Sequence, residues 1–235
     1  MIGRLSLIVL TTCAAIIYTK PLGTTLGRGV QAPCATSIAN CPADGCGGAP
    51  YRDQIQNRLK NRIDVPTLPL ARSIGQISAL PEPDFWAPNQ QRSIEVTKLE
   101  KTAVIVKAYL LDARRAGIET ANCLLKGETN DDWMLSLAPS RNTPKAAWVT
   151  AEVTPRIRKE KEGWDFEKLR YLSQTGGYVR LTGWLLLDTT HINRPVVRRT
   201  NWEIHPVTEI EVCSAPSGSC FKGGWVTLGR FEIVQ

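Results

Sequence analysis

Histidine is scarce in this sequence, with two residues among 235. A catalytic zinc site takes three protein ligands, and strong structural zinc sites use two short Cys or His pairs. The sequence contains no paired metal-binding histidines. The sequence also lacks a Gly-rich phosphate-binding loop, a Gly-x-Ser-x-Gly nucleophile elbow and a Cys/His catalytic pattern. These absences favour a protein without catalytic activity, and we expect no cofactor and no metal.

The uncharged run at the N-terminus, residues 5–19, is too short to favour a membrane-spanning helix of about 20 residues. Arg4 precedes it, so the segment has the charged and apolar regions of a secretory signal. We therefore expect residues 1–20 to be a signal peptide or N-terminal anchor, and the protein to be periplasmic or extracellular. No Ala-x-Ala site follows, and Thr12 stands before Cys13 where a lipoprotein has a smaller residue, so cleavage and lipidation stay open.

Six further cysteines, an even number, indicate disulfides in an exported chain. Cys213 and Cys220 flank the turn-rich segment SAPSGS, so we expect these two to pair. Three others form the cluster CATSIANCPADGC at residues 34–46, and the last is Cys123. Because no histidine lies near the cluster, we expect disulfides or free thiols there rather than a zinc site.

Positive charge exceeds negative charge, with 29 Lys and Arg against 22 Asp and Glu and a net charge of +7. Three of the positive charges (Arg4, Lys20 and Arg28) precede Gln31, which leaves +4 for the rest of the chain. A balance of this size fits a solvated basic surface as well as an anionic ligand.

Residues 21–91 are rich in Gly and Pro and predict a Cys/Pro-rich tether with one short helix. In residues 51–64, Ile55, Leu59 and Ile63 recur every four positions. This spacing predicts a narrow apolar stripe on an otherwise polar helix.

Five short apolar segments follow, interrupted once by a helical stretch. The segments are residues 101–113, 131–138, 146–154, 178–188 and 200–212. The helix is expected over 164–174, between the third and fourth strands, with Asp165 as N-cap and Gly176 as stop signal. This order is typical of the oligonucleotide/oligosaccharide-binding (OB) barrel, so we predict a mainly β, five-stranded OB-like domain over 92–235. Residues 224–234 are expected to add an edge strand.

The segments DDWMLSL, AAWVTAEV, VRLTGWLLLD and above all TNWEIHPVTEIEV resemble a group of uncharacterised bacterial exported proteins with an OB-like domain. In that group a Trp-Glu-Leu/Ile-His-Pro-Val-Thr segment closes the domain, and an Asp-Trp/Tyr-His-Ile/Leu segment forms an earlier strand. The resemblance covers about residues 100–212 and implies fold and export rather than an activity. This chain has Met134 where the group usually has His, so a polar site joining that His to Glu203 and His205 would be incomplete here.

Alternation along the strands sorts their side chains into two faces. Trp202 and Ile204 are expected to point into the barrel and Glu152 away from it. Six candidate ligand-binding residues are expected on the outside: Trp148, Tyr178, Arg180, Trp184, Glu203 and His205. The loop between the last two strands adds three more candidates, Arg194, Arg198 and Arg199. OB folds bind single-stranded nucleic acid through aromatic side chains, on which bases stack, beside basic loops. Alternatively, Trp148 and Trp184 lie beneath the tether or the C-terminal strand in a second small core.

Glu203 and His205 are the one acid–imidazole pair that shares a strand face. They are suited to bridging a water or a metal, although a structural hydrogen bond is the more frequent use. The leading interpretation is an exported non-enzymatic OB-like binding or interaction module with an unknown ligand. The alternatives are a binder of single-stranded nucleic acid or another anion, and a metal-assisted hydrolase or nuclease. Another protein of the cell envelope is a further conceivable partner.

Overall fold

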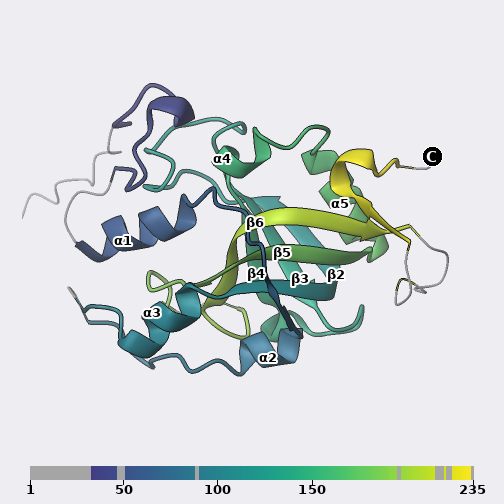
Figure 1. Cartoon of the computed structure of the whole chain (residues 1–235), viewed down its shortest axis with the longest axis horizontal. Helices are drawn as coiled ribbons and strands as arrows, with labels where there is room; N and C mark the ends of the chain where they lie inside the picture. The colour runs from purple at the N-terminus through teal and green to yellow at the C-terminus, as the bar shows by residue number, and fades with distance from the viewer. Residues whose placement is uncertain are drawn as a thin grey trace, which may run out of the picture. The chain divides into compact units, whose positions relative to one another are not determined.

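The centre of the fold is a closed barrel of five strands (Figure 1). The strands are β2 (Ala103–Arg115), β3 (Trp133–Ala138), β4 (Val149–Val153), β5 (Tyr178–Leu187) and β6 (Trp202–Cys213). They neighbour one another in the order β2-β3-β4-β6-β5, and pairing of β2 with β5 closes the barrel. All neighbours are antiparallel except β4 and β6, which are parallel. The predicted mainly β, OB-like barrel is therefore confirmed.

The computed structural model describes residues 33–46, 51–87, 90–194, 197–214, 220 and 224–233. They belong to a unit that begins at Ala32. The predicted signal segment, residues 1–20, and Cys13 within it lie outside the described residues. Within the described ranges, no helix has the length and apolar character needed to cross a membrane.

Alternate side chains of the strands fill the barrel, as the period-two pattern predicts. In β6, Trp202 and Ile204 are fully buried in the core, on the predicted inward face. Gly183 lies where β5 passes β6, and a Cβ there would be 2.5 Å from the carbonyl oxygen of Pro206. Only glycine permits this close approach of the two backbones.

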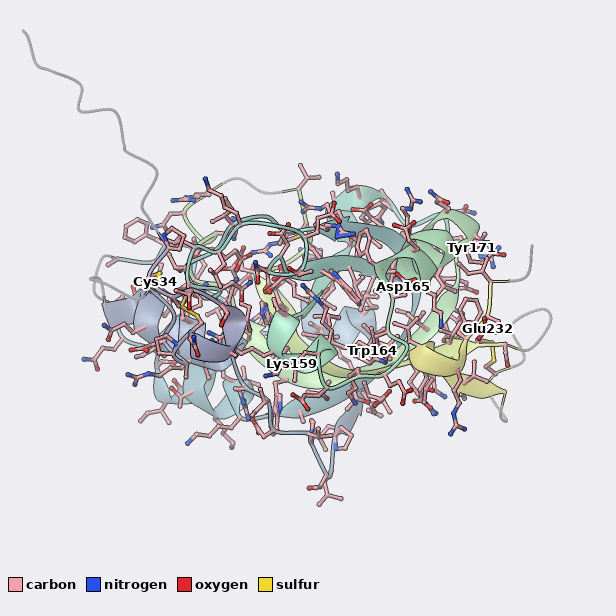
Figure 2. All side chains as sticks on the ribbon, turned by 90° about the horizontal axis from the view of Figure 1, so that it is seen from above. Cys34, Lys159, Trp164, Asp165, Tyr171 and Glu232 are labelled. Carbon is pink, nitrogen blue, oxygen red and sulfur yellow. A yellow bond between two sulfur atoms is a disulfide. The ribbon has the colours of Figure 1, made fainter. Side chains whose placement is uncertain are left out.

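The helix predicted over 164–174 is α5 (Phe166–Thr175), which follows the short helix α4 (Pro155–Arg158) between β4 and β5. Asp165 accepts a hydrogen bond from the backbone of Glu167, and Gly176 ends the helix in the left-handed conformation. Its buried face packs into the core through Phe166, Leu169 and Leu172. Figure 2 shows Asp165 and Tyr171 of this region on the same side of the barrel as Glu232 of the C-terminal segment.

Two short strands extend the sheet. β1 (Leu70–Arg72) pairs with β2 in parallel, and β7 (Trp225–Thr227) pairs with β6, so the expected edge strand is present but short. Helices α2 (Ile74–Ser78) and α3 (Ile94–Glu100) precede the barrel, and 3₁₀ turns lie at Ile38–Asn40, Lys145–Ala147 and Leu228–Arg230. Much of the predicted tether is thus part of the folded unit, because it supplies β1, α2 and the helix α1 (Tyr51–Lys60).

Helix α1 packs on the barrel through polar side chains, contrary to the expected apolar stripe. Ile55 and Leu59 are only half-buried, and Ile63, beyond the helix, is 66% exposed. The buried side chains are instead Gln56, Asn57 and Asn61. Each hydrogen-bonds to loop or barrel groups, including Asp188, the carbonyl oxygen of Asp44 and that of Ala121. The helix covers a charged part of the barrel wall, so polar groups are what this contact needs.

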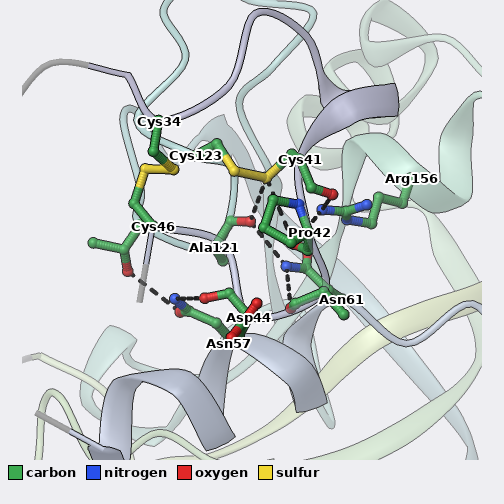
Figure 3. The surroundings of a disulfide bond; sticks show 12 residues. Cys34, Cys41, Pro42, Asp44, Cys46, Asn57, Asn61, Ala121, Cys123 and Arg156 are labelled. Atoms are coloured by element: carbon green, nitrogen blue, oxygen red, sulfur yellow. Dashed lines mark hydrogen bonds between the residues drawn. A yellow bond between two sulfur atoms is a disulfide. The ribbon is translucent and has the colours of Figure 1, made fainter. Parts of the chain in front are cut away.

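Three disulfides join Cys34 to Cys46, Cys41 to Cys123 and Cys213 to Cys220. The predicted pairing of Cys213 with Cys220 is confirmed, and the N-terminal cluster forms disulfides. Figure 3 shows the Cys41–Cys123 bond, with Arg156 donating hydrogen bonds to the carbonyl oxygens of Cys41 and Pro42. Three disulfides fit a protein of an oxidising environment.

Candidate functional site

The nine residues predicted to bind a ligand do not form one groove. Tyr178 and Arg180 lie on the outer face of the barrel, where β5 begins. Glu203 and His205 belong to a buried polar cluster on the barrel wall, and Arg198 contacts Glu203 from behind. The other four are separate from both places: Trp148, Trp184, Arg194 and Arg199.

Trp184 is half-buried against Arg62 and Asp64 of the predicted tether, in agreement with the alternative that placed it beneath the tether. Its indole Nε1 donates to the carbonyl oxygen of Asp64, and the guanidinium of Arg62 lies 3.6 Å from the ring centre. Trp148 is half-buried and donates to the carbonyl oxygen of Thr143. Both indole N–H groups are therefore already engaged in protein contacts.

Arg194 and Arg199 are exposed. Arg194 lines a polar pocket of about 300 Å³, together with residues of α1 and of the loops after β2 and β5. Most of the charge in this pocket is paired, because Lys60 contacts Glu119 at 2.8 Å and His191 contacts Asp188. The pocket therefore offers little free positive charge to an anion.

An aromatic–basic face lies on the outside of the barrel. It consists of six side chains from β2, β5, β7 and the loop after β3: Lys107, Tyr109, Arg141, Tyr178, Arg180 and Trp225. Tyr109 and Tyr178 are directly paired across β2 and β5, with ring centres 4.9 Å apart. The Trp225 ring lies 5.8 Å from that of Tyr178, so the three half-buried rings form a continuous group.

Three cations lie over these rings. Lys107 and Arg180 are 5.7 Å and 4.8 Å from the centre of the Trp225 ring, and Arg141 is 5.5 Å from that of Tyr109. Arg180 also forms an ion pair with Glu211, whereas Lys107 and Arg141 are exposed. The face therefore combines aromatic surface with accessible positive charge.

The buried polar cluster consists of Asp132, Glu152, Glu203 and His205. Asp132 immediately precedes β3, Glu152 is in β4, and Glu203 and His205 are in β6. Alternation turns all of them away from the barrel interior, as predicted for the last three, yet each is at most 2% exposed. The expectation of an open surface was wrong here because helix α1 packs on β6, and the loops after β2 and β5 place Asn122 and Arg198 against the cluster.

The three carboxylates surround the imidazole ring of His205. His205 Nδ1 lies 3.2 Å from Glu152 Oε2 and 3.5 Å from Glu203 Oε2, and Nε2 lies 3.4 Å from Asp132 Oδ2. None of these contacts has hydrogen-bond geometry, so these three oxygens and both ring nitrogens are buried without a hydrogen-bond partner. Ligand atoms of Asp132, Glu152 and His205 all lie within 4.8 Å of one another, which is compatible with one bound metal ion.

A second layer of side chains orients the cluster. Asn122 donates to Asp132 Oδ1 at 2.8 Å, and Arg198 donates to Glu203 Oε1 and, at 2.9 Å, to Asp188 Oδ2. Arg198 was predicted to contact a ligand from its loop, but the structure buries the guanidinium between these two carboxylates. The free oxygens of Asp132 and Glu203 are thereby left facing His205.

The cluster perturbs the acidity of its members strongly. Burial alone would lower the pKa of His205, but Glu152, Asp132 and Glu203 outweigh it and raise the pKa to about 10. Burial and the neighbouring Glu203 hold the pKa of Glu152 well above its usual value. Burial opposes ionisation of Asp132 as well, yet the adjacent His205 lowers its pKa. Without a further cation, a protonated His205 is therefore the positive charge that faces these carboxylates.

Sequence reasoning identified Glu203 and His205 but missed Asp132 and the burial of Glu152. Glu203 and His205 are two residues apart on one strand, so alternation alone places them on the same face. Asp132 and Glu152 come from neighbouring strands, and bringing them to this face requires the strand register. That register pairs Met134 with Glu152 across β3 and β4. Met134, where the resemblance led us to expect a His, is thus beside the cluster.

No protein-family model and no curated protein matches this chain. The resemblance to the exported bacterial group therefore stays a prediction that rests on its motif residues.

Proposed function

We propose that the protein is an exported OB-like binding module whose ligand surface is the aromatic–basic face. The observation that carries the proposal is the continuous group of Tyr109, Tyr178 and Trp225 rings with cations over them. The three disulfides support an oxidising compartment, as export requires.

Single-stranded nucleic acid is the ligand class that this chemistry favours. Bases stack on aromatic side chains whatever their sequence, and Lys107 and Arg141 are free to contact phosphates from the two sides of the ring group. Glu211 offsets the charge of Arg180, so few phosphates can be neutralised. We therefore expect weak binding that falls steeply as salt is added.

The test is fluorescence anisotropy with a labelled single-stranded oligonucleotide at two salt concentrations. Trp225→Ala should weaken binding about tenfold, because each stacked base contributes about 1–3 kcal/mol. Lys107→Ala combined with Arg141→Ala should weaken it further and reduce the salt dependence.

Trp184→Ala is the matched control, since Trp184 is also an aromatic ring of β5 under an arginine but lies away from the face. It should bind like the unmodified protein. The proposal would be contradicted if the Trp225→Ala variant and the unmodified protein bound the oligonucleotide equally well, or if the unmodified protein did not bind it even at low salt.

A further inference from the structure

The buried polar cluster carries more unpaired polar atoms than a structural ion network needs. His205 has no exposed surface, and both of its ring nitrogens lack a hydrogen-bond partner. Three carboxylate oxygens that face it also lack one. Buried polar atoms are normally paired, and each unpaired one is costly. A missing cation beside Nδ1 explains that nitrogen and the two glutamate oxygens together, while Asp132 Oδ2 is the acceptor that faces Nε2.

We propose that Asp132, Glu152, Glu203 and His205 form a binding site for a divalent transition-metal ion, with Zn²⁺ as the best fit. Imidazole and carboxylate are ligands that Zn²⁺ accepts, at bond lengths of about 2.0–2.2 Å. The ligand atoms of a tetrahedral site with such bonds lie about 3.3 Å apart. The distances from His205 Nδ1 to Glu152 Oε2 and Glu203 Oε2, 3.2 Å and 3.5 Å, match this spacing.

The surroundings of the cluster have the features of an outer coordination layer. A metal-bound histidine usually donates its other N–H to a carboxylate, and Asp132 lies 3.4 Å from Nε2. Asp132 is held by Asn122, and Glu203 is held by Arg198, so the bound oxygens are fixed from behind. Asp132 serves either as the fourth ligand or as this second-layer acceptor.

The site is closed to solvent, which assigns it a structural role. Catalytic zinc keeps a position open for water or substrate, whereas structural zinc is enclosed by protein. All four side chains are at most 2% exposed, and they join β3, β4 and β6 beneath α1. A bound ion would therefore hold the three strand segments together.

Metal analysis of the full, untagged chain tests the proposal. After removal of metal by a chelator and dialysis against Zn²⁺, we expect one ion per chain and a Tm about 5–10 °C higher at a 100-fold excess over the Kd. Co²⁺ in place of Zn²⁺ should give visible absorption bands of nitrogen and oxygen ligands without a thiolate charge-transfer band. The absence of a thiolate band distinguishes binding at the cluster from binding at Cys13.

A parallel titration with Mn²⁺ shows whether another divalent ion binds better.

Glu152→Gln should weaken metal binding at least tenfold, because it removes one ligand charge at nearly constant shape. Glu100→Gln is the matched control, since Glu100 is equally buried but pairs with Arg92 outside the cluster. Failure of the unmodified chain to retain or respond to either ion would overturn the proposal, as would unchanged binding by Glu152→Gln. Should that variant not fold, the Co²⁺ spectrum of the unmodified chain decides, and a thiolate band would count against the cluster.

Discussion

Arg198 lies in a loop, yet its side chain is 11% exposed and contacts two buried carboxylates, Glu203 and Asp188. Those two carboxylates are 2% and 4% exposed, and the guanidinium is the one cation that contacts both of them among the described residues. Breaking a buried ion pair by removing one partner is more damaging than replacing both, because the remaining charge is left in a poorly solvated place. The length and fork of arginine let one side chain bridge both carboxylates.

Arg198→Ala should therefore lower the free energy of unfolding by about 3–5 kcal/mol. The adjacent Arg199 is exposed, and Arg199→Ala should change stability by less than about 0.5 kcal/mol. Urea denaturation of both variants beside the unmodified chain measures the difference, with a chelator present so that bound metal does not contribute. Equal small losses would mean that the guanidinium does not neutralise the buried carboxylates.

At the scale of the element, the barrel strands and α5 could be predicted because local signals agree with their burial. Trp202 and Ile204 alternate with polar residues in β6, and Asp165 and Gly176 mark the ends of α5. Helix α1 could be located but its packing could not. The spacing of its apolar residues predicted an apolar inward face. The helix instead buries polar side chains, because the barrel wall that it covers carries charged residues from distant parts of the chain.

The same limit applies to the two candidate sites. Tyr178 and Arg180 were recognisable on one strand face, but Tyr109 and Trp225 reach them through pairing with other strands. Pairs far apart in the sequence carry no local signal, so a single sequence does not reveal the ring group.

The two disulfides at opposite ends of the described chain should differ in their contribution to stability. Cys41–Cys123 spans 82 residues and Cys213–Cys220 spans 7. In the chain-entropy model, a longer closed loop restricts the unfolded chain more, so removing the first bond should cost about 2 kcal/mol more than removing the second.

Chemical denaturation of the Cys41→Ser, Cys123→Ser double variant and the Cys213→Ser, Cys220→Ser double variant measures this order. Both are compared with the unmodified chain under oxidising conditions. The reverse order would show that native contacts around the short loop, rather than chain entropy, dominate its effect.

At the scale of the whole molecule, the aromatic–basic face and the buried polar cluster lie toward opposite ends of the paired strands β5 and β6. Glu203 is paired with Leu186 near the end of β5, whereas Glu211 is paired with Arg180 near its start. Eight residues of extended strand separate the two glutamates, which corresponds to about 25 Å. The described contacts give the two groups no common side chain.

Metal binding and oligonucleotide binding should therefore be energetically independent. Changes at sites more than about 7–10 Å apart that share no partners usually have additive effects on free energy. The face and the cluster meet both conditions. We expect Zn²⁺ to leave the Kd for a single-stranded oligonucleotide unchanged within about twofold, and Trp225→Ala to leave the Kd for Zn²⁺ equally unchanged. Anisotropy titrations with and without saturating Zn²⁺, at a temperature where both forms are folded, measure the first effect, and calorimetric titration of the variant measures the second. Because coupling between two binding equilibria is reciprocal, a tenfold change in the oligonucleotide Kd on adding Zn²⁺ must be matched by the same change in the Zn²⁺ Kd on adding oligonucleotide. Such a change would show that the barrel transmits a conformational change along β5 and β6.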